Sequence, residues 1–285
     1  MIAAVLWIGA ALELALYTLL TVILQRLGWQ WGPALTLCVA LAVSWRTGFI
    51  LMTFRLSRVA PRPAWALTET AAFTAATVLM MFAPLMARVS RGESGRAPVL
   101  LLHGWNCNSG IWWPLRQILR RSRCGDVYTV NLPAWRSLDA HVQFIAVQVE
   151  EILASSGHAR IALVGHSMGG VIGRLYLASD QGRDRVARLV TLGSPHHGTS
   201  LGHRALDPAG RDLNVGSVRV TGLPPLGTDV PVTAMYSEID NFVAPQSSAL
   251  LEGAENLSCG DIGHLQLLFT VPVLQAVAVR LEHTR

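Results

Sequence analysis

Residues 160–178 read RIALVGHSMGGVIGRLYLA, an apolar run, a turn and a helical pattern in direct succession. The run IALV is short and wholly apolar, which is typical of a strand buried on both faces of a sheet. The turn has the form G-x-S-x-G, which exposes a serine between strand and helix and needs small residues where backbone segments pass closely. Glycine stands at positions 165, 169 and 170. The stretch predicts that Ser167 is a nucleophile; a glycine-rich turn without chemistry is the alternative.

Around this stretch, apolar runs and helical patterns alternate from Pro98 to the C-terminus. Such alternation predicts βαβ units and a mostly parallel sheet flanked by helices, the α/β class. We expect about six strands, at 98–102, 127–132, 161–165, 189–192, 232–236 and 256–259, and helices at 111–121, 138–155, 169–178 and 264–281.

A serine hydroxyl needs a base, and the base needs a third group that orients it. When the serine sits in such a turn, the acid and then the histidine follow it along the chain. Asp240 and His264 occupy these places, with Glu238 as the rival acid. Three histidines precede the acid and are expected to line the site or lie at the surface: His196, His197 and His203.

Stabilisation of an oxyanion requires two backbone N–H groups. We expect one from Met168 and one from Trp105, with Gly104 allowing its loop to come close. Tryptophans cluster at 105, 112 and 113, which indicates either an acyl-chain pocket or membrane-facing rim, or helix packing. We expect substrate contacts from Trp105, Trp112 and His166, the last packing under the nucleophile.

Five stretches resemble bacterial lipases of the α/β-hydrolase superfamily: PVLLLHGWNCNSGIW (98–112), VGHSMGG (164–170), LVTLGSPHHGT (189–199), YSEIDNFVAP (236–245) and IGHLQLL (262–268). The resemblance implies a minimal form of that fold with a short cap at 199–229. It implies a triad of Ser167, Asp240 and His264, with Trp105 and Met168 donating to the oxyanion, and lipid esters as substrates. Many such lipases hold calcium through an Asp just after the histidine. Leu265, Gln266 and Leu267 follow His264 here, so we expect no metal and no cofactor.

The first third of the chain holds three apolar stretches, at 1–24, 33–54 and 65–87. Each exceeds the roughly 20 residues with which a helix crosses a bilayer core. We expect about three transmembrane helices in a membrane region at 1–90, a linker at 91–97, and a hydrolase domain at 98–285. A signal peptide or buried core helices are the alternatives. Each stretch has one charge: Glu13 and Arg46 could pair across helices, and Glu69 could reach the membrane interface.

The net charge of +5 belongs to residues 1–96, with eight Arg and three Glu, whereas the remainder is formally neutral. This distribution excludes a basic nucleic-acid-binding face on the domain. Arg55, Arg58 and Arg62 in the second connection favour a domain exported across a bacterial inner membrane to the periplasm, under the positive-inside rule. Arginines after the third stretch argue for the cytoplasm, and the balance slightly favours export. The cysteines form no metal motif; Cys107 and Cys259 could pair, or the thiols could be free.

The sequence therefore predicts a membrane-anchored serine hydrolase for carboxylic esters, with lipid or small-ester substrates and membrane lipids as partners. An acyltransferase or thioesterase with the same triad is the alternative, and a haloperoxidase also shares it. A non-catalytic membrane protein that keeps the fold is a third hypothesis. An epoxide hydrolase or dehalogenase is excluded, because it requires Asp at position 167. The oligomeric state is left open.

Overall fold

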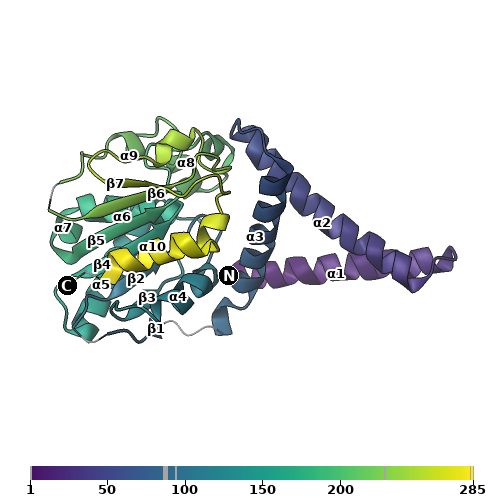
Figure 1. Ribbon diagram of the computed structural model, residues 1–285, viewed down its shortest axis with the longest axis horizontal. Helices are drawn as coiled ribbons and strands as arrows, with labels where there is room; N and C mark the ends of the chain where they lie inside the picture. Colours follow the sequence, from purple (N-terminus) through teal and green to yellow (C-terminus); the bar gives the residue numbers. More distant parts are fainter. Residues whose placement is uncertain (1, 86–88, 94, 228, 283, 285) are drawn as a thin grey trace.

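The computed structural model describes residues 2–85, 89–93, 95–227, 229–282 and 284. The chain from Val89 onward centres on a seven-stranded sheet in the order β1-β3-β2-β4-β5-β6-β7 (Figure 1). Every neighbouring pair is parallel except β1 with β3. The strands are β1 (Val89–Ser90), β2 (Val99–Leu102), β3 (Val127–Thr129), β4 (Ile161–His166), β5 (Val186–Leu192), β6 (Val232–Tyr236) and β7 (Glu255–Ser258).

Alternate residues of each strand feed two hydrophobic cores, because successive side chains point to opposite faces of a sheet. Leu100 and Leu102 of β2 pack in one core with α5 (Leu138–Ser156) and α6 (Met168–Ala178). Val99 and Leu101 pack in the other with α4 (Trp113–Leu119) and α10 (Val271–Glu282). The predicted α/β class and the six expected strands are confirmed.

The remaining helices of the domain are short: α7 (Asp180–Arg185), α8 (Pro208–Asp212) and α9 (Val218–Thr221). The 3-10 turns are η1 (Ala83–Leu85), η2 (Ser109–Trp112), η3 (Ser200–Arg204), η4 (Gln246–Ala249) and η5 (Gln266–Leu268).

Two expected elements are corrected. The helix expected at 264–281 begins only at Val271, because residues 264–266 use their backbone N–H groups to bind side chains from elsewhere in the chain. A seventh strand, β1, lies in the part of the chain that was expected to be a membrane region, directly before the linker expected at 91–97. In that linker the Gly92 N–H donates to Asp126 Oδ1 at 2.8 Å, which ties it to the sheet edge. Residues 86–88, at the end of the third apolar stretch, and Ser94 of the linker lie outside the described residues.

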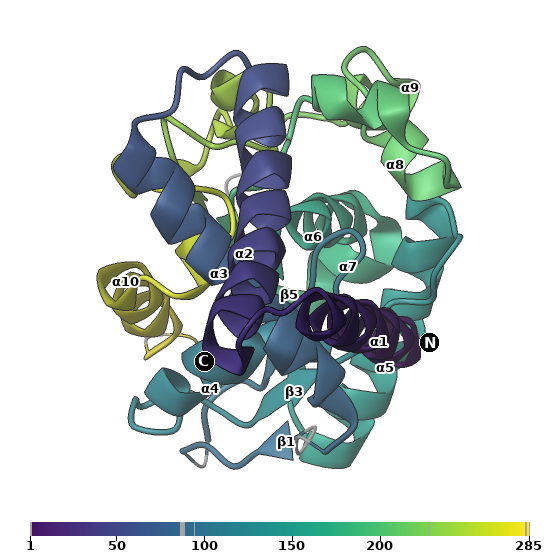
Figure 2. The ribbon, with the colours of Figure 1, turned by 90° about the vertical axis from the view of Figure 1, so that its right-hand side faces the viewer.

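The N-terminal helices are α1 (Ile2–Arg26), α2 (Trp31–Leu56) and α3 (Pro63–Met81). All three are long and apolar enough to be candidate membrane spans. α1 and α2 project from the domain as a two-helix stem, whereas α3 runs along the domain surface (Figures 1 and 2). The expected pairing of Glu13 with Arg46 is confirmed at 2.9 Å between Oε2 and Nη2 within the stem.

One face of helix α3 packs against the domain. Ala72, Ala76 and Met80 belong to the core cluster that also contains β2, α4 and α10. Asn108 Nδ2 donates to the Met80 carbonyl at 2.9 Å near the end of the helix. Glu69 is fully buried, which corrects the expectation that it reaches the membrane interface. The reason is that its carboxylate binds backbone N–H groups of the domain.

All four cysteines are free thiols, and Cys38, Cys107 and Cys124 are buried. The pairing of Cys107 with Cys259 that we considered is therefore not formed in this structure.

Candidate active site

Ser167 stands between β4 and α6 with φ 55° and ψ −126°, a conformation that L-residues rarely adopt. The turn is possible because the neighbouring residues lack side chains. A Cβ on Gly165 would collide with the backbone of Gly170, and a Cβ on Gly169 would collide with the Leu102 carbonyl. The Ser167 N–H donates to the Leu192 carbonyl at 2.9 Å, which fixes the turn against β5. The close packing of β4, α6 and β2 therefore holds Ser167 in this strained conformation.

The loop after β2 passes directly beside the serine. A Cβ on Gly104 would lie 2.9 Å from the Ser167 Cβ, so this approach requires glycine. His103 holds the loop, since its Nε2 accepts from the Leu132 N–H at 2.9 Å and burial lowers the pKa of its imidazole to about 4. Among the described residues, the backbone N–H groups of Trp105 and Met168 donate to no protein acceptor. Both remain available to an oxygen bound at Ser167.

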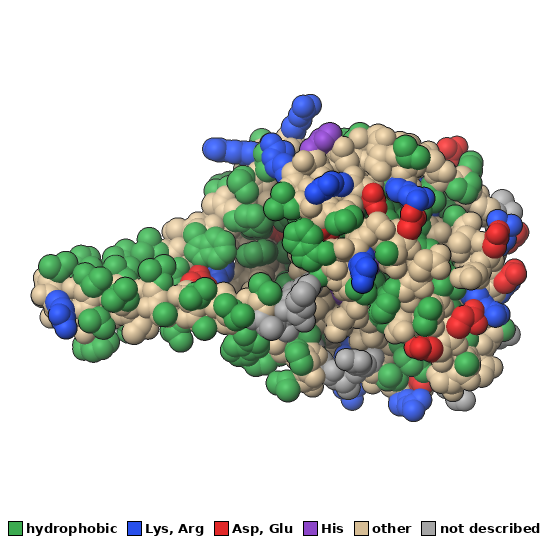
Figure 3. Space-filling view, turned by 180° about the vertical axis from the view of Figure 1, so that it is seen from behind, with side chains coloured by type: hydrophobic (Ala, Val, Ile, Leu, Met, Phe, Trp, Pro, Cys, Tyr) green, Lys and Arg blue, Asp and Glu red, His purple; other side chains and the backbone are tan. Residues whose placement is uncertain are grey.

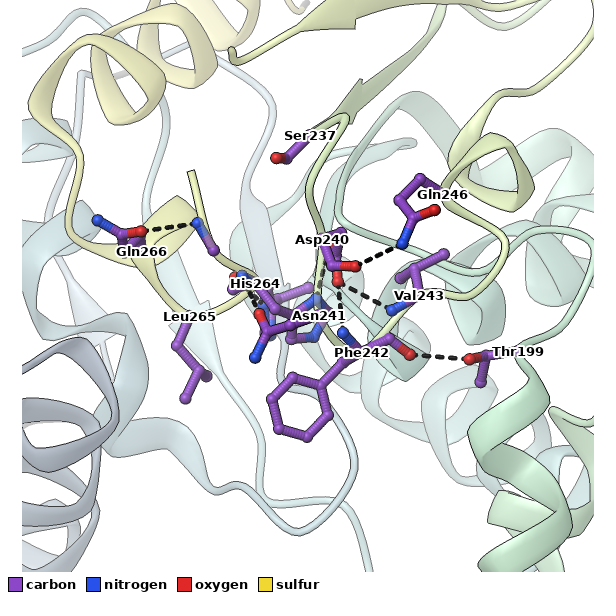
Figure 4. A network of polar contacts seen from close by, with 12 residues as sticks. Thr199, Ser237, Asp240, Asn241, Phe242, Val243, Gln246, His264, Leu265 and Gln266 are labelled. Atoms are coloured by element: carbon purple, nitrogen blue, oxygen red, sulfur yellow. Dashed lines mark hydrogen bonds and ion pairs between the residues drawn. The ribbon is translucent and has the colours of Figure 1, made fainter. Parts of the chain in front are cut away.

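Asp240 and His264 are paired deep in the domain, after β6 and β7 (Figure 4). His264 Nδ1 donates to Asp240 Oδ2 at 2.8 Å, and both residues are buried. The other carboxylate oxygen, Oδ1, accepts from the N–H groups of Phe242 and Val243 at 2.8 Å each. Glu238, the rival acid, is exposed to solvent.

Opposing effects act on the imidazole of His264. Burial by itself lowers the pKa of His264, but the charge of Asp240, its hydrogen bond and the nearby Glu69 carboxyl together raise it above the ordinary value. His166 stacks beside it at 4.5 Å between ring centroids, and burial holds the pKa of His166 well below its ordinary value. The pKa values of the two neighbouring imidazoles are therefore shifted in opposite directions, that of His264 upward and that of His166 downward.

The remaining predicted histidines lie away from this pair. His196 is buried against Thr191, with 3.0 Å between its Nε2 and the hydroxyl, and burial lowers its pKa to about 3. His197 and His203 are exposed.

The loop that carries His264 is held by side chains that sequence reasoning missed. The His264 N–H donates to Asn241 Oδ1 at 3.0 Å, and Asn241 Nδ2 donates to Thr53 Oγ1 of α2 at 2.7 Å. Glu69 of α3 accepts from the next two N–H groups, those of Leu265 and Gln266, at 2.8 and 3.1 Å. The only sequence signal was a lone carboxylate in an apolar helix, which does not identify its partner.

Two cavities meet at residues 104–107. One of about 250 Å³ contains Ser167 and His264, and the other of about 280 Å³ lies toward the cap and contains Met168 and Asp207. Trp105 lines both, and its indole N–H donates to Asp207 Oδ1 at 2.8 Å.

The other two residues expected to contact the substrate, His166 and Trp112, lie in different places. His166 lines the cavity that contains the serine. Trp112 is fully buried in the core that also holds α4 and lines neither cavity, so its expected role in substrate binding is replaced by packing. No group of three or more His, Cys, Asp or Glu side chains among the described residues could hold a metal ion.

The C-terminal part of the chain is similar to known proteins. Residues 97–215 match the profile of the α/β-hydrolase fold family. A triacylglycerol lipase of Burkholderia plantarii is 32% identical over 154 residues, covering 51% of this chain and 42% of that protein. A triacylglycerol lipase of Pseudarthrobacter phenanthrenivorans is 32% identical over 114 residues, covering 37% and 35%. The matches thus span less than half of these relatives. The mature lipase BlEst2 of Bacillus licheniformis superposes with a TM-score of 0.59 at 20% identity, covering 67% of this chain and 96% of that structure.

Proposed function

We propose that this chain, whose C-terminal domain is an α/β-hydrolase related to bacterial lipases and esterases, is a membrane-anchored serine hydrolase of carboxylic esters. The observation that carries the proposal is that a serine and a histidine bound to a buried carboxylate line one cavity. Ser167 is held in a strained turn, His264 is bound to the buried Asp240, and both Ser167 and His264 line the cavity of about 250 Å³.

In the proposed reaction, Ser167 Oγ attacks the ester carbonyl and its proton passes to Nε2 of His264. Asp240 orients the imidazole and stabilises its charged form. The N–H groups of Trp105 and Met168 donate to the developing oxyanion. The proton then moves to the leaving alkoxide and the alcohol departs. Water attacks the acyl-enzyme with His264 again as base, which releases the carboxylic acid and restores the serine.

We propose lipid esters of the acylglycerol type as substrates. The cavity at Ser167 has mostly apolar walls, among them Phe242 and Leu265, and the names of two relatives specify triacylglycerols. The cavity toward the cap carries charged groups, Arg204 and Asp207, which suit the polar part of such an ester. Transfer of the acyl group to an acceptor other than water would use the same residues, and no observation favours it over hydrolysis.

We further propose that only α1 and α2 cross the membrane. The connection before α3 and the end of α3 both touch the domain: Gln246 Nε2 donates to the Ser57 carbonyl, directly after α2, and Asn108 binds Met80 near the end of α3. A helix held this way cannot place the domain and the second connection on opposite sides of a bilayer. Trp7 of α1 also donates to the Met81 carbonyl at 2.9 Å, so the start of α1 lies on the domain's side.

This arrangement reverses the orientation favoured by sequence. The arginines of the second connection and those after α3 then share one side with the domain, and Arg26 alone lies at the far turn. Figure 3 shows the stem covered with apolar side chains, with positive charge at its tip and where it meets the domain. The positive-inside rule puts the arginine-rich side in the cytoplasm. We therefore propose a domain at 98–285, joined by α3 and β1 to a two-helix anchor and facing the cytoplasm.

The test of the catalytic proposal is active-site labelling combined with an ester panel. A fluorophosphonate probe should label the detergent-solubilised protein at Ser167 and abolish hydrolysis of esters. Ser167→Ala should lose both labelling and hydrolysis while it keeps the thermal unfolding profile of the wild type. Labelling that persists in Ser167→Ala would overturn the assignment of the nucleophile.

A further inference from the structure

One wall of the cavity that contains Ser167 comes from the N-terminal helices. α2 contributes Phe49, and α3 contributes Phe73, Ala76 and Met80. The stem and the helix that joins it to the domain thus form part of the site.

An aromatic series connects these helices to the proposed base. Phe73 and Phe49 lie 5.4 Å apart between ring centroids, and Phe49 and Phe242 lie 6.5 Å apart. Phe242 in turn lies 5.2 Å from the ring of His264. The apolar wall therefore runs without interruption from α3 to the imidazole. A cavity of this kind, closed by rings and aliphatic side chains beside one reactive group, suits an apolar ligand.

The occupant follows from the position of the wall. Helices α1 and α2 expose many large apolar side chains outward, which places lipid next to the helices that form the inner wall. The part of a lipid ester that is apolar and bonded directly to the reacting carbonyl is its acyl chain. A chain entering from the bilayer side would lie between α2, α3 and the domain, with its carbonyl at Ser167.

Glu69 ties this wall to the catalytic loop. Its two oxygens accept from the N–H groups of Leu265 and Gln266, directly after His264, and a Cβ on Gly263 would collide with the same carboxylate. Burial raises the pKa of Glu69 to about 7, and loss of its two hydrogen bonds leaves two loop N–H groups without their acceptor. A displacement of α3 therefore displaces the loop that bears the imidazole.

From these contacts we infer that α2 and α3 form the acyl-chain subsite, and that Glu69 is a positioning residue that keeps this subsite aligned with His264. The inference rests on the proposed ester hydrolase function and assigns part of that site to helices outside residues 98–285.

Its first test is a chain-length series on the full protein in detergent, with acetyl, butanoyl, dodecanoyl and hexadecanoyl esters. Ala76→Phe fills the cavity and should lower kcat/KM for the two long esters about tenfold or more relative to the acetyl ester, since single-group changes in apolar pockets have effects of this size. Phe73→Ala enlarges the cavity and should shift the preference the other way. The matched control is Val78→Phe on the outward face of the same helix, where the side chain is 47% exposed and the ratio should not change.

The second test concerns Glu69. Glu69→Gln should lower kcat on all chain lengths by a similar factor, roughly ten- to a hundredfold, because small displacements of a catalytic group have such effects. The KM for the butanoyl ester should stay within about twofold of the wild-type value. Rates are divided by the number of sites that the fluorophosphonate titrates, so partial unfolding does not mimic the effect. Gly263→Ala disturbs the same contact from the loop, and Glu13→Gln in the stem is the control.

The outcomes separate the two proposals. If the wild type hydrolyses no ester and is not labelled, the proposed function fails. If it hydrolyses esters but Ala76→Phe and Val78→Phe give the same chain-length profile, the acyl subsite lies elsewhere and the inference is overturned. A normal kcat per titrated site in both Glu69→Gln and Gly263→Ala would overturn the positioning role.

Discussion

At the scale of single residues, the two carboxylate oxygens of Asp240 accept hydrogen bonds from different partners. One oxygen accepts from two backbone N–H groups and fixes the side chain, while the other binds Nδ1 of His264. The exposed Glu238, two positions earlier, has no such environment and serves as a matched control. Replacement of each by its amide separates orientation by a buried charge from a general loss of negative charge.

We expect Asp240→Asn to lower kcat by about 10⁴-fold, the effect of the same change in the best-studied serine triad, and Glu238→Gln to change it little.

The pH profile of Asp240→Asn should shift as well. His264 acts as base only when neutral, so its raised pKa places the rise in activity at higher pH. Removal of the Asp240 charge leaves burial to lower that pKa, with the Glu69 carboxyl as the remaining opposing group and His166 neutral. The rise should move to lower pH in Asp240→Asn, as measured by kcat between pH 5 and 9. A larger effect of Glu238→Gln would show that the acid is misassigned.

At the scale of elements, α3 belongs to one of the two cores of the α/β domain although its composition is that of a membrane span. We expect a protein truncated to residues 62–285 to fold and hydrolyse the butanoyl ester, because it keeps α3, β1 and Glu69. A protein truncated to 91–285 loses the buried Ala72, Ala76 and Met80 and the acceptor for two loop N–H groups. It should unfold at lower temperature, and its kcat per titrated site should fall at least tenfold. Equal activity of the two truncated proteins would show that α3 is an anchor only.

This contrast also shows which features the sequence could predict. The strand-to-helix turn at Ser167, the two flanking glycines and the order of Asp240 and His264 depend on neighbouring residues, so local patterns were sufficient to propose them. The link from Glu69 to Leu265 joins positions 196 residues apart, and nothing near Glu69 in sequence indicates a partner. The edge strand β1 was missed because two residues are too few for a periodic pattern. The position of α3 was missed because burial in protein and burial in lipid select the same apolar residues.

At the scale of the whole molecule, the proposed two-helix anchor determines on which side of the membrane the proposed reaction takes place. α1 begins beside Met81, and α2 ends beside Gln246. The two helices therefore form a hairpin that begins and ends at the domain. Glu13 and Arg46 form an ion pair within this hairpin. The pairing reduces the free-energy cost of placing two charges in a hydrophobic environment. In this proposal the start of α1, the second connection and the candidate active site all lie on one side.

Cysteine accessibility in intact cells tests this topology. Single cysteines are introduced at Gln30 in the far turn, at Ala60 in the second connection and at Ala154 on the domain, all exposed positions, in a chain whose native cysteines are replaced by serine or alanine. With the domain in the cytoplasm, a membrane-impermeant maleimide added outside should label Gln30→Cys alone. Permeabilised cells should allow labelling at all three positions, which is the control for reactivity.

If three helices crossed the membrane, Ala60→Cys and Ala154→Cys would lie on opposite sides, because α3 lies between them. Labelling of Ala154→Cys without Ala60→Cys in intact cells would therefore restore the exported orientation. Labelling of both without Gln30→Cys would keep the two-helix anchor and invert it, against the arginine distribution.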